Sequence, residues 1–146
     1  RLFKDWHTPV CDRLEWTPPG AILQTDLHDI PPFASWTQGH VTLLGDAAHP
    51  TTPNMGQGAC MAIESAYVLS RCLKEQTDIT SALRRYEEQR HARTAWITNM
   101  SWEIGKVAQI ENTFLCILRD FALKLTPTDL VQFSLRRATG FDVTST

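Results

Sequence analysis

The residues with the clearest chemical potential lie between a short apolar run and the start of a helical pattern. Asp46 closely follows the apolar run 41–44, and a carboxylate outside the carboxyl end of a buried strand is where open α/β sheets bind ligands. Such a carboxylate suits a sugar or polyol hydroxyl. Gly45, Ala47 and Ala48 add almost no bulk around it, so a large flat ligand could approach the main chain closely.

The second half of this segment leads into a helix. Pro50 and Pro53 stiffen the loop, and a GQG triplet at 56–58 delivers the chain into a helical pattern that begins near Ala59. The first N–H groups of a helix have no intrahelical partners and lie at the positive end of its dipole, so they favour negative charge on a ligand. An acid before a Gly/Pro-rich loop is equally typical of a plain turn, and Met61 stands where a GxGxxG fingerprint requires its third glycine.

Apolar spacing predicts the elements that position these residues. Alternating or continuous apolar residues predict a strand at 21–27 and a buried strand at 41–44. Helical spacing predicts a short helix after Thr8-Pro9 and further helices over 59–73, 79–107, 113–125 and from Thr126-Pro127 to Gly140. These elements predict a helix-rich α+β fold, with a few strands followed by long helices.

Composition limits the class of protein. A chain of 146 residues fits one domain, and its 14 basic and 16 acidic residues form no basic block, which argues against a nucleic-acid partner. No apolar run is long enough for a transmembrane segment. Four cysteines lie far apart, without a CxxC pair or a histidine at metal-ligand spacing, so we expect reduced thiols, no metal site and a cytoplasmic location. The sequence begins at Arg1, and we interpret it as a fragment.

Several segments, in order, resemble one enzyme family. The stretch GHVTLLGDAAHPTTPNMGQGACMAIESAYVLSRCL, residues 39–73, resembles the second flavin-binding motif of the FAD-dependent aromatic-ring hydroxylases. These are the single-component flavoprotein monooxygenases that include p-hydroxybenzoate hydroxylase. Within it, PNMGQGACMAIE is most similar to the branch of the zeaxanthin epoxidases and urate hydroxylases. Residues 26–41 and 82–101 resemble the flanking segments of that branch, and a looser similarity reaches residue 142.

The resemblance implies the C-terminal portion of an FAD-binding α/β fold of the p-hydroxybenzoate hydroxylase type. Residues 1–40 would be a lead-in with a remnant of the substrate-domain region, 41–77 the second FAD-binding motif, and 78–146 a C-terminal helical region. The uncovered edges and apolar faces of such a portion predict self-association or a complementing N-terminal chain.

The resemblance also implies roles for individual residues. Asp46 would hydrogen-bond a ribityl hydroxyl of FAD. The Pro53 carbonyl would face the flavin carbon that carries the hydroperoxide, and the N–H groups of Ala59 and Cys60 would meet the pyrimidine edge of the flavin. The remaining implied cofactor-binding positions are small residues: Gly45, Ala47, Gly56 and Gly58.

Family enzymes reduce FAD with NADH or NADPH, form a flavin hydroperoxide with dioxygen, and transfer one oxygen atom to an aromatic or olefinic substrate. Water is the second product. The resemblance therefore implies an NAD(P)H-using monooxygenase that hydroxylates or epoxidises a small molecule. The family's GxGxxG unit and its middle Asp-Gly motif do not occur in this sequence, so the chain holds about half of a cofactor site. A flavin-free remnant that acts as a binding or scaffolding domain is the alternative hypothesis.

Three residues near the motif have open roles. His49 could transfer a proton as a catalytic group, because imidazole titrates near neutrality, or it could order the loop. Ser65 replaces the aspartate of the family's A-I-E-D-A pattern. Glu64 is expected to orient the helix start.

Other polar and aromatic residues have plainer expected roles. We expect His28 and His91 at the surface. Four arginines interleaved with glutamates are expected on a solvated helix face: Arg84, Arg85, Arg90 and Arg93. Four aromatic residues could line a substrate pocket or belong to a core or an interface: Trp96, Trp102, Phe114 and Phe121.

Overall fold

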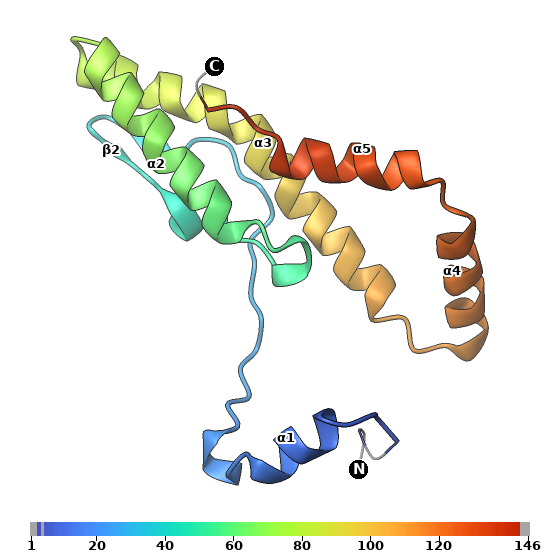
Figure 1. Cartoon of the computed structure of the whole chain (residues 1–146). Coiled ribbons are helices and arrows are strands. Elements are labelled where there is room, and N and C mark those ends of the chain that lie inside the picture. Colours follow the sequence, from blue (N-terminus) through green and yellow to red (C-terminus); the bar gives the residue numbers. More distant parts are fainter. Residues whose placement is uncertain (1–2, 4, 144–146) are drawn as a thin grey trace.

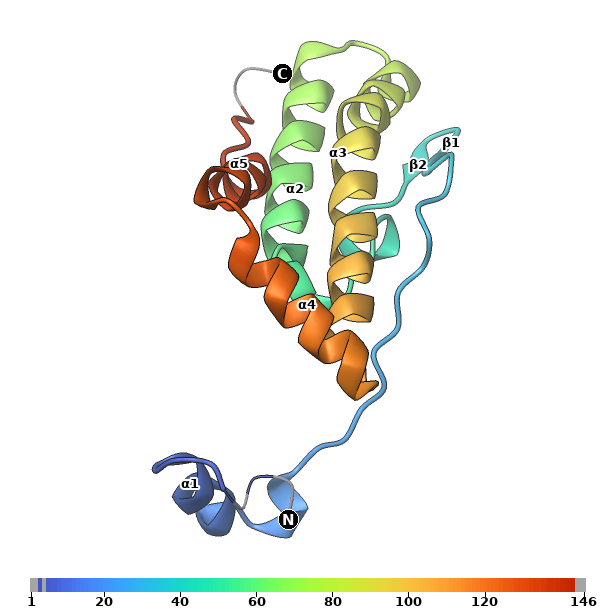
Figure 2. The ribbon, with the colours of Figure 1, turned by 90° about the vertical axis from the view of Figure 1, so that its right-hand side faces the viewer.

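Two long antiparallel helices form the centre of the molecule. A computed structural model describes residues 3 and 5–143, and this part contains five α-helices and one two-stranded sheet. The two longest helices, α2 (Gly58–Glu75) and α3 (Ile79–Ala108), lie side by side (Figures 1 and 2). The prediction of a helix-rich fold with long C-terminal helices is confirmed.

Short polar junctions separate the helices. Asp78 caps α3 by accepting hydrogen bonds from the N–H and hydroxyl of Ser81 at 2.8 and 2.7 Å. Asn112 caps the next helix by accepting a hydrogen bond from the Leu115 N–H at 3.1 Å. Two helices complete the chain: α4 (Thr113–Leu125) and α5 (Thr128–Thr139). These boundaries agree with the predicted ones to within about two residues, because spacing and caps are local signals.

The N-terminal part lies apart from the helix pair. α1 (Val10–Trp16) and a 3-10 turn, η1 (Pro19–Ala21), sit at the end of an extended segment (Figure 2). The predicted strand at 21–27 is wrong, since these residues pair with no strand in the described part of the chain. Leu23 is 86% exposed. Alternating apolar residues form a strand only where a neighbouring strand supplies hydrogen-bond partners.

A small hairpin precedes the motif. β1 (Thr37–Gln38) pairs antiparallel with β2 (Val41–Thr42), and Gly39 between them has a φ of +59°. The predicted strand at 41–44 is therefore shorter than expected, and it is not buried, because its first residue is 68% exposed. The described residues contain no further strand. The open α/β sheet expected around the motif is not formed by this part of the chain.

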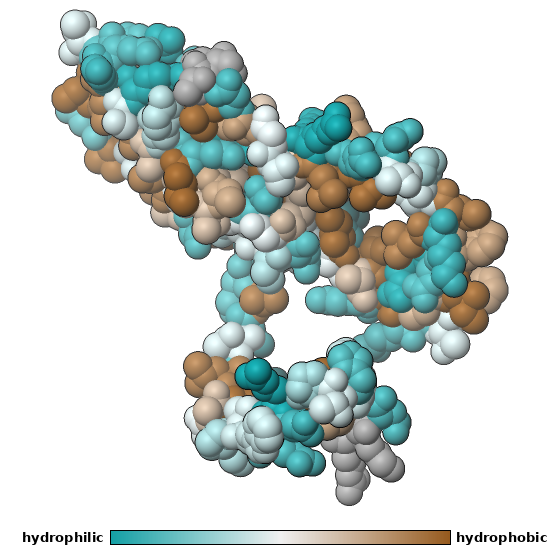
Figure 3. Space-filling model, in the orientation of Figure 1, coloured by the Kyte–Doolittle hydropathy of each residue, from teal (hydrophilic) through white to brown (hydrophobic). Residues whose placement is uncertain are grey.

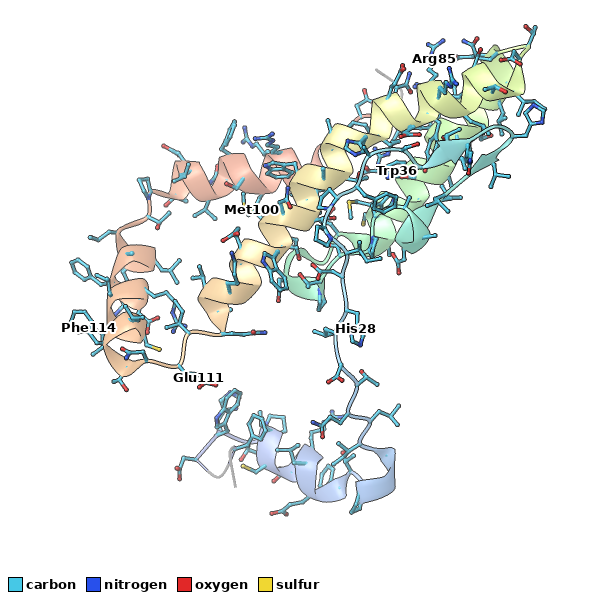
Figure 4. The ribbon with its side chains drawn as sticks, turned by 180° about the vertical axis from the view of Figure 1, so that it is seen from behind. His28, Trp36, Arg85, Met100, Glu111 and Phe114 are labelled. Atoms are coloured by element: carbon cyan, nitrogen blue, oxygen red, sulfur yellow. The ribbon has the colours of Figure 1, made fainter. Side chains whose placement is uncertain are left out.

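The core lies where the segment before β1 meets the helix pair. Its buried apolar residues come from four elements or loops: Trp36, Ala48, Val68, Cys72, Ala82 and Tyr86. Trp36 is central to this core, because its ring centroid lies 5.6, 5.9 and 5.5 Å from those of His49, Tyr86 and His91. Figure 4 shows the Trp36 side chain pointing toward the helices. The core thus includes Ala48, a residue of the motif loop.

Helices α4 and α5 present apolar side chains to solvent. No residue of α4 is buried, and Figure 3 shows apolar surface gathered on this helix. Of the four aromatic residues with open roles, three are exposed: Trp102, Phe114 and Phe121. Trp96 instead packs beneath the guanidinium of Arg137, 4.3 Å from its ring centroid. None of the helices within the described residues is both long and apolar enough to cross a bilayer.

Candidate functional site

The motif loop contains two single turns of 3-10 helix, η2 (Gly45–Ala47) and η3 (Pro53–Met55). Gly45 is buried and has a φ of +63°, in the left-handed region that residues with a side chain rarely adopt. A Cβ there would lie 3.6 Å from the Cβ of Ala62, an ordinary contact distance. The backbone conformation, rather than a lack of space, therefore requires glycine at this position.

Five of the predicted site residues line one open groove. We call it the loop groove; its volume is about 600 Å³. It is lined by Asp46, Thr51, Thr52, Pro53, Gly56, Gly58, Ala59 and Ala62. Three of the predicted cofactor-binding residues do not line it: Gly45 is buried, and Ala47 and Cys60 are exposed outside the lining. The groove combines one carboxylate with side chains that are almost all small.

Helix α2 begins at the edge of the loop groove. Gly56, with a φ of +63°, turns the chain, and Gln57 is the N-cap residue. Among the described residues no side chain caps this helix end. The first hydrogen bond of the helix runs from the Met61 N–H to the Gln57 carbonyl, at 2.9 Å. The N–H groups of residues 58–60 precede this bond and form a donor set for an acceptor in the groove.

Hydrogen bonds with helix α3 hold the motif loop in place. The buried Ser101 hydroxyl donates to the Thr52 carbonyl at 2.7 Å and lies 2.8 Å from the Thr52 hydroxyl. Asn54 Nδ2 donates to the Ser101 carbonyl and to the Thr52 hydroxyl, both at 3.0 Å. A Cβ at Gly105 would overlap the Asn54 amide. Sequence reasoning missed these anchors, although the four-residue spacing of Ser101 and Gly105 places two small residues on one helix face.

A buried polar network continues beneath the loop. His49 is buried, and its Nε2 lies 3.0 Å from the Ser65 hydroxyl, which accepts a hydrogen bond from Arg90 Nε at 3.1 Å. Burial lowers the pKa of His49, and the positive charge of Arg90 lowers it further. The backbone carbonyl of His49 has the opposite effect on this pKa, smaller than that of burial. His49 does not line the loop groove. This placement favours the loop-ordering role over direct proton transfer.

The network ends in a cluster of ion pairs formed by Glu64, Arg90 and Arg93. The prediction that Arg90 and Arg93 lie on a solvated helix face is therefore wrong. The fully buried Arg90 side chain donates to Glu64 Oε2 at 2.7 Å, while Arg93 donates to both carboxylate oxygens at 2.8 Å. Burial raises the pKa of Glu64, but hydrogen bonds from Arg93 and Arg90 outweigh it and leave the pKa below its usual value. Arg84 is exposed and Arg85 is half-buried. Glu64 therefore fastens the start of α2 to α3.

The two remaining histidines differ from each other. His28 is exposed on the extended segment, as predicted (Figure 4). The prediction is wrong for His91, which is half-buried. Its Nε2 lies 3.0 Å from the Phe33 carbonyl oxygen, and its ring packs against Trp36. His91 thus holds the segment before β1 onto α3.

Comparisons with known proteins identify the relatives of this chain. The family described as FAD binding domain matches residues 32–101. Aurachin C monooxygenase/isomerase from Stigmatella aurantiaca is 44% identical over 139 residues, which cover 95% of this chain and 36% of the relative. FAD-dependent urate hydroxylase from Klebsiella pneumoniae is 44% identical over 90 residues, 62% of this chain and 23% of the relative. The chain belongs to the FAD-binding monooxygenase family. The resemblance predicted from the motif is confirmed.

Solved structures of family members share the fold of this chain. A variant of HpxO from Klebsiella pneumoniae, complexed with FAD, matches with a TM-score of 0.82 and 31% identity over 94% of this chain and 36% of that one. HpxO complexed with FAD and uric acid matches with a TM-score of 0.77, 32% identity and coverages of 88% and 33%. This chain spans about a third or less of the relatives it matches. The loop groove and the buried network both lie within the family segment 32–101.

Proposed function

We propose that this chain supplies the ribityl and isoalloxazine side of the FAD site in a monooxygenase. The enzyme would use NADH or NADPH and would hydroxylate or epoxidise an aromatic or olefinic small molecule. The observation that carries the proposal is the loop groove, where one carboxylate, small residues and an uncapped helix start come together. The names of the relatives support the reaction class, and uric acid in one HpxO complex supports a small aromatic substrate.

The residues of the loop groove fit a flavin. Its volume of about 600 Å³ lies within the range of small-molecule pockets, and its small side chains leave the main chain accessible to a flat ring. Asp46 would accept a hydrogen bond from a ribityl hydroxyl, and the N–H groups of Ala59 and Cys60 would donate to the pyrimidine edge. The Pro53 carbonyl would face the ring. Bound FAD would supply hydride acceptance and dioxygen activation.

Residues of this chain would stabilise negative charge on the flavin and fix the position of the motif loop. Within the described residues no side chain caps the start of α2, so its first N–H groups and the positive end of the helix dipole would stabilise the negative charge that a flavin gains on reduction. Ser101 and Asn54 fix the loop from α3. We propose that His49 orders the loop through Ser65 and takes no direct part in proton transfer. Preorganisation of this kind limits the reorganisation needed on binding.

The rest of the enzyme must come from outside this segment, in a longer polypeptide or a complementing chain. The chain spans 36% of aurachin C monooxygenase/isomerase, and large apolar side chains of α4 and α5 are exposed. Exposed apolar surface on this scale favours association, so we expect the isolated chain to self-associate or to bind a complementing chain. Sedimentation velocity over rising concentration tests this. A monomer at every concentration would contradict self-association.

A visible absorption titration of FAD with the 146-residue chain tests the proposal. We expect a saturable perturbation of the flavin band. Asp46→Ala removes a charged hydrogen-bond acceptor and should weaken binding by about 10-fold or more. Asp26→Ala, on the exposed extended segment, is the matched control and should bind as the wild type does. A folded chain that leaves the flavin spectrum unchanged at high FAD would favour the flavin-free scaffolding alternative.

A further inference from the structure

A second, much smaller hollow lies behind His49. Its volume is about 10 Å³. It is bounded by the segment before β1, the motif loop and α3, through Trp36, Ala48, His49, His91, Thr94 and Thr98. It shares no lining residue with the loop groove. We call it the rear cavity.

Three buried polar atoms belong to residues that line the rear cavity. Trp36 Nε1, His49 Nδ1 and Thr98 Oγ1 have no hydrogen-bond partner within the described part of the chain. Each residue is at least nine-tenths buried. An unpaired buried polar atom is costly, and most such atoms in folded proteins are paired with protein or ordered water. That three residues lining one small cavity each carry such an atom points to a polar ligand in that cavity.

The other threonine of the cavity wall behaves differently. The Thr94 hydroxyl lies 3.1 Å from the carbonyl oxygens of Arg90 and His91, to which it donates. Its hydrogen-bonding capacity is used within α3, as is common for threonine in helices. Thr94 and Thr98 therefore form a matched pair on the same helix, one satisfied internally and one not.

We propose that a single water molecule binds in the rear cavity and bridges Trp36, His49 and Thr98. The size fits, because a cavity of about 10 Å³ holds one water molecule. The chemistry also fits. An indole N–H can only donate, so the ligand must accept a hydrogen bond, which excludes ammonium and other cations. Water both donates and accepts, and it therefore satisfies His49 Nδ1 in either tautomer together with the threonine hydroxyl.

The bound water extends the buried polar network to the far side of the imidazole. His49 Nε2 is held by Ser65 on α2, and the water would hold Nδ1 through Trp36 and Thr98. Partners on both ring nitrogens fix the orientation of a histidine side chain. The water thus joins three separate parts of the chain beneath the motif loop. Binding of this water does not require FAD, so its test is independent of the test of the proposed function.

A crystal structure of the 146-residue chain at a resolution that orders water molecules tests the inference. We expect one density peak within about 2.7–3.2 Å of all three atoms. Thr98→Ile replaces the hydroxyl by the larger, apolar ethyl group, so the peak should be lost. Thr94→Val, the matched control, should retain it. A wild-type map with no peak would overturn the proposal whatever the variants do, and so would a peak that persists unchanged in Thr98→Ile.

Discussion

Removal of the Glu64 carboxylate tests the buried polar network that joins α2 to α3. Glu64 accepts hydrogen bonds from Arg90 at 2.7 Å and from Arg93 at 2.8 Å to each oxygen. Because the Arg90 side chain is fully buried, Glu64→Ala leaves its positive charge without a counter-charge. Breaking a buried pair in this way costs about 3–5 kcal/mol. Domains have roughly 5–15 kcal/mol of unfolding free energy, so we expect a large fraction of the stability to be lost.

Urea unfolding followed by far-ultraviolet circular dichroism measures this loss. Glu64→Gln keeps the shape and one acceptor oxygen, so its cost should be smaller, about 1–3 kcal/mol. Glu103→Ala is the matched control, because the ion pair of Glu103 with Lys106 is exposed at the surface of α3 and such pairs contribute about 0–1 kcal/mol. All variants should be compared at a concentration at which their association state is the same.

The same carboxylate predicts a pH dependence. The folded-state pKa of Glu64 lies below its usual value, so its stabilisation is fully present above the unfolded-state pKa and is lost as the pH falls through the folded-state pKa. Glu64→Gln should remove this part of the acid-side loss. If Glu64→Ala were as stable as Glu103→Ala to within about 1 kcal/mol, the network would not fasten the two helices and the reasoning would be refuted.

Three further predictions concern the loop. Burial lowers the folded-state pKa of His49, so wild-type stability should decrease as the pH falls below the usual histidine value, and urea titrations of His49→Gln should show a flatter profile there. Gly45→Ala should cost about 1–2 kcal/mol in thermal unfolding because of its positive φ, whereas Gly58→Ala, with an ordinary contact at 3.5 Å, should stay within about 0.5 kcal/mol. Ser101→Ala leaves the Thr52 carbonyl without its donor; it should cost about 1–3 kcal/mol and speed limited proteolysis of the loop, and unchanged cleavage would count against the anchor.

The helices could be predicted from the sequence, whereas the strands could not. Periodic apolar residues and a cap such as Asp78 act over a few neighbouring residues. A strand depends on a partner that sequence does not identify. Residues 21–27 alternate in the right way but have no partner strand in the described part of the chain, and residues 41–44 pair only at Val41 and Thr42.

The loop groove was largely predictable, but the network beneath it was not. Asp46, Pro53 and the glycines stand together in the sequence, so one local motif predicts one site. Arg90 lies among glutamates in the sequence, which indicates a wet helix face, yet its burial is decided by Glu64 on another helix. The exchange of the family's aspartate for Ser65 gave no hint that this hydroxyl lies between His49 and Arg90.

The most direct test of the central claim is to map FAD onto the backbone by ¹⁵N NMR of the 146-residue chain. We expect saturable shifts for the amides of Gly58, Ala59 and Cys60 at the start of α2. Amides of α5, which do not line the loop groove, should not move. FAD that binds but leaves the amides of residues 58–60 unshifted, or that shifts no amide while the chain is folded, would contradict the claim that this segment supplies the isoalloxazine side of the site.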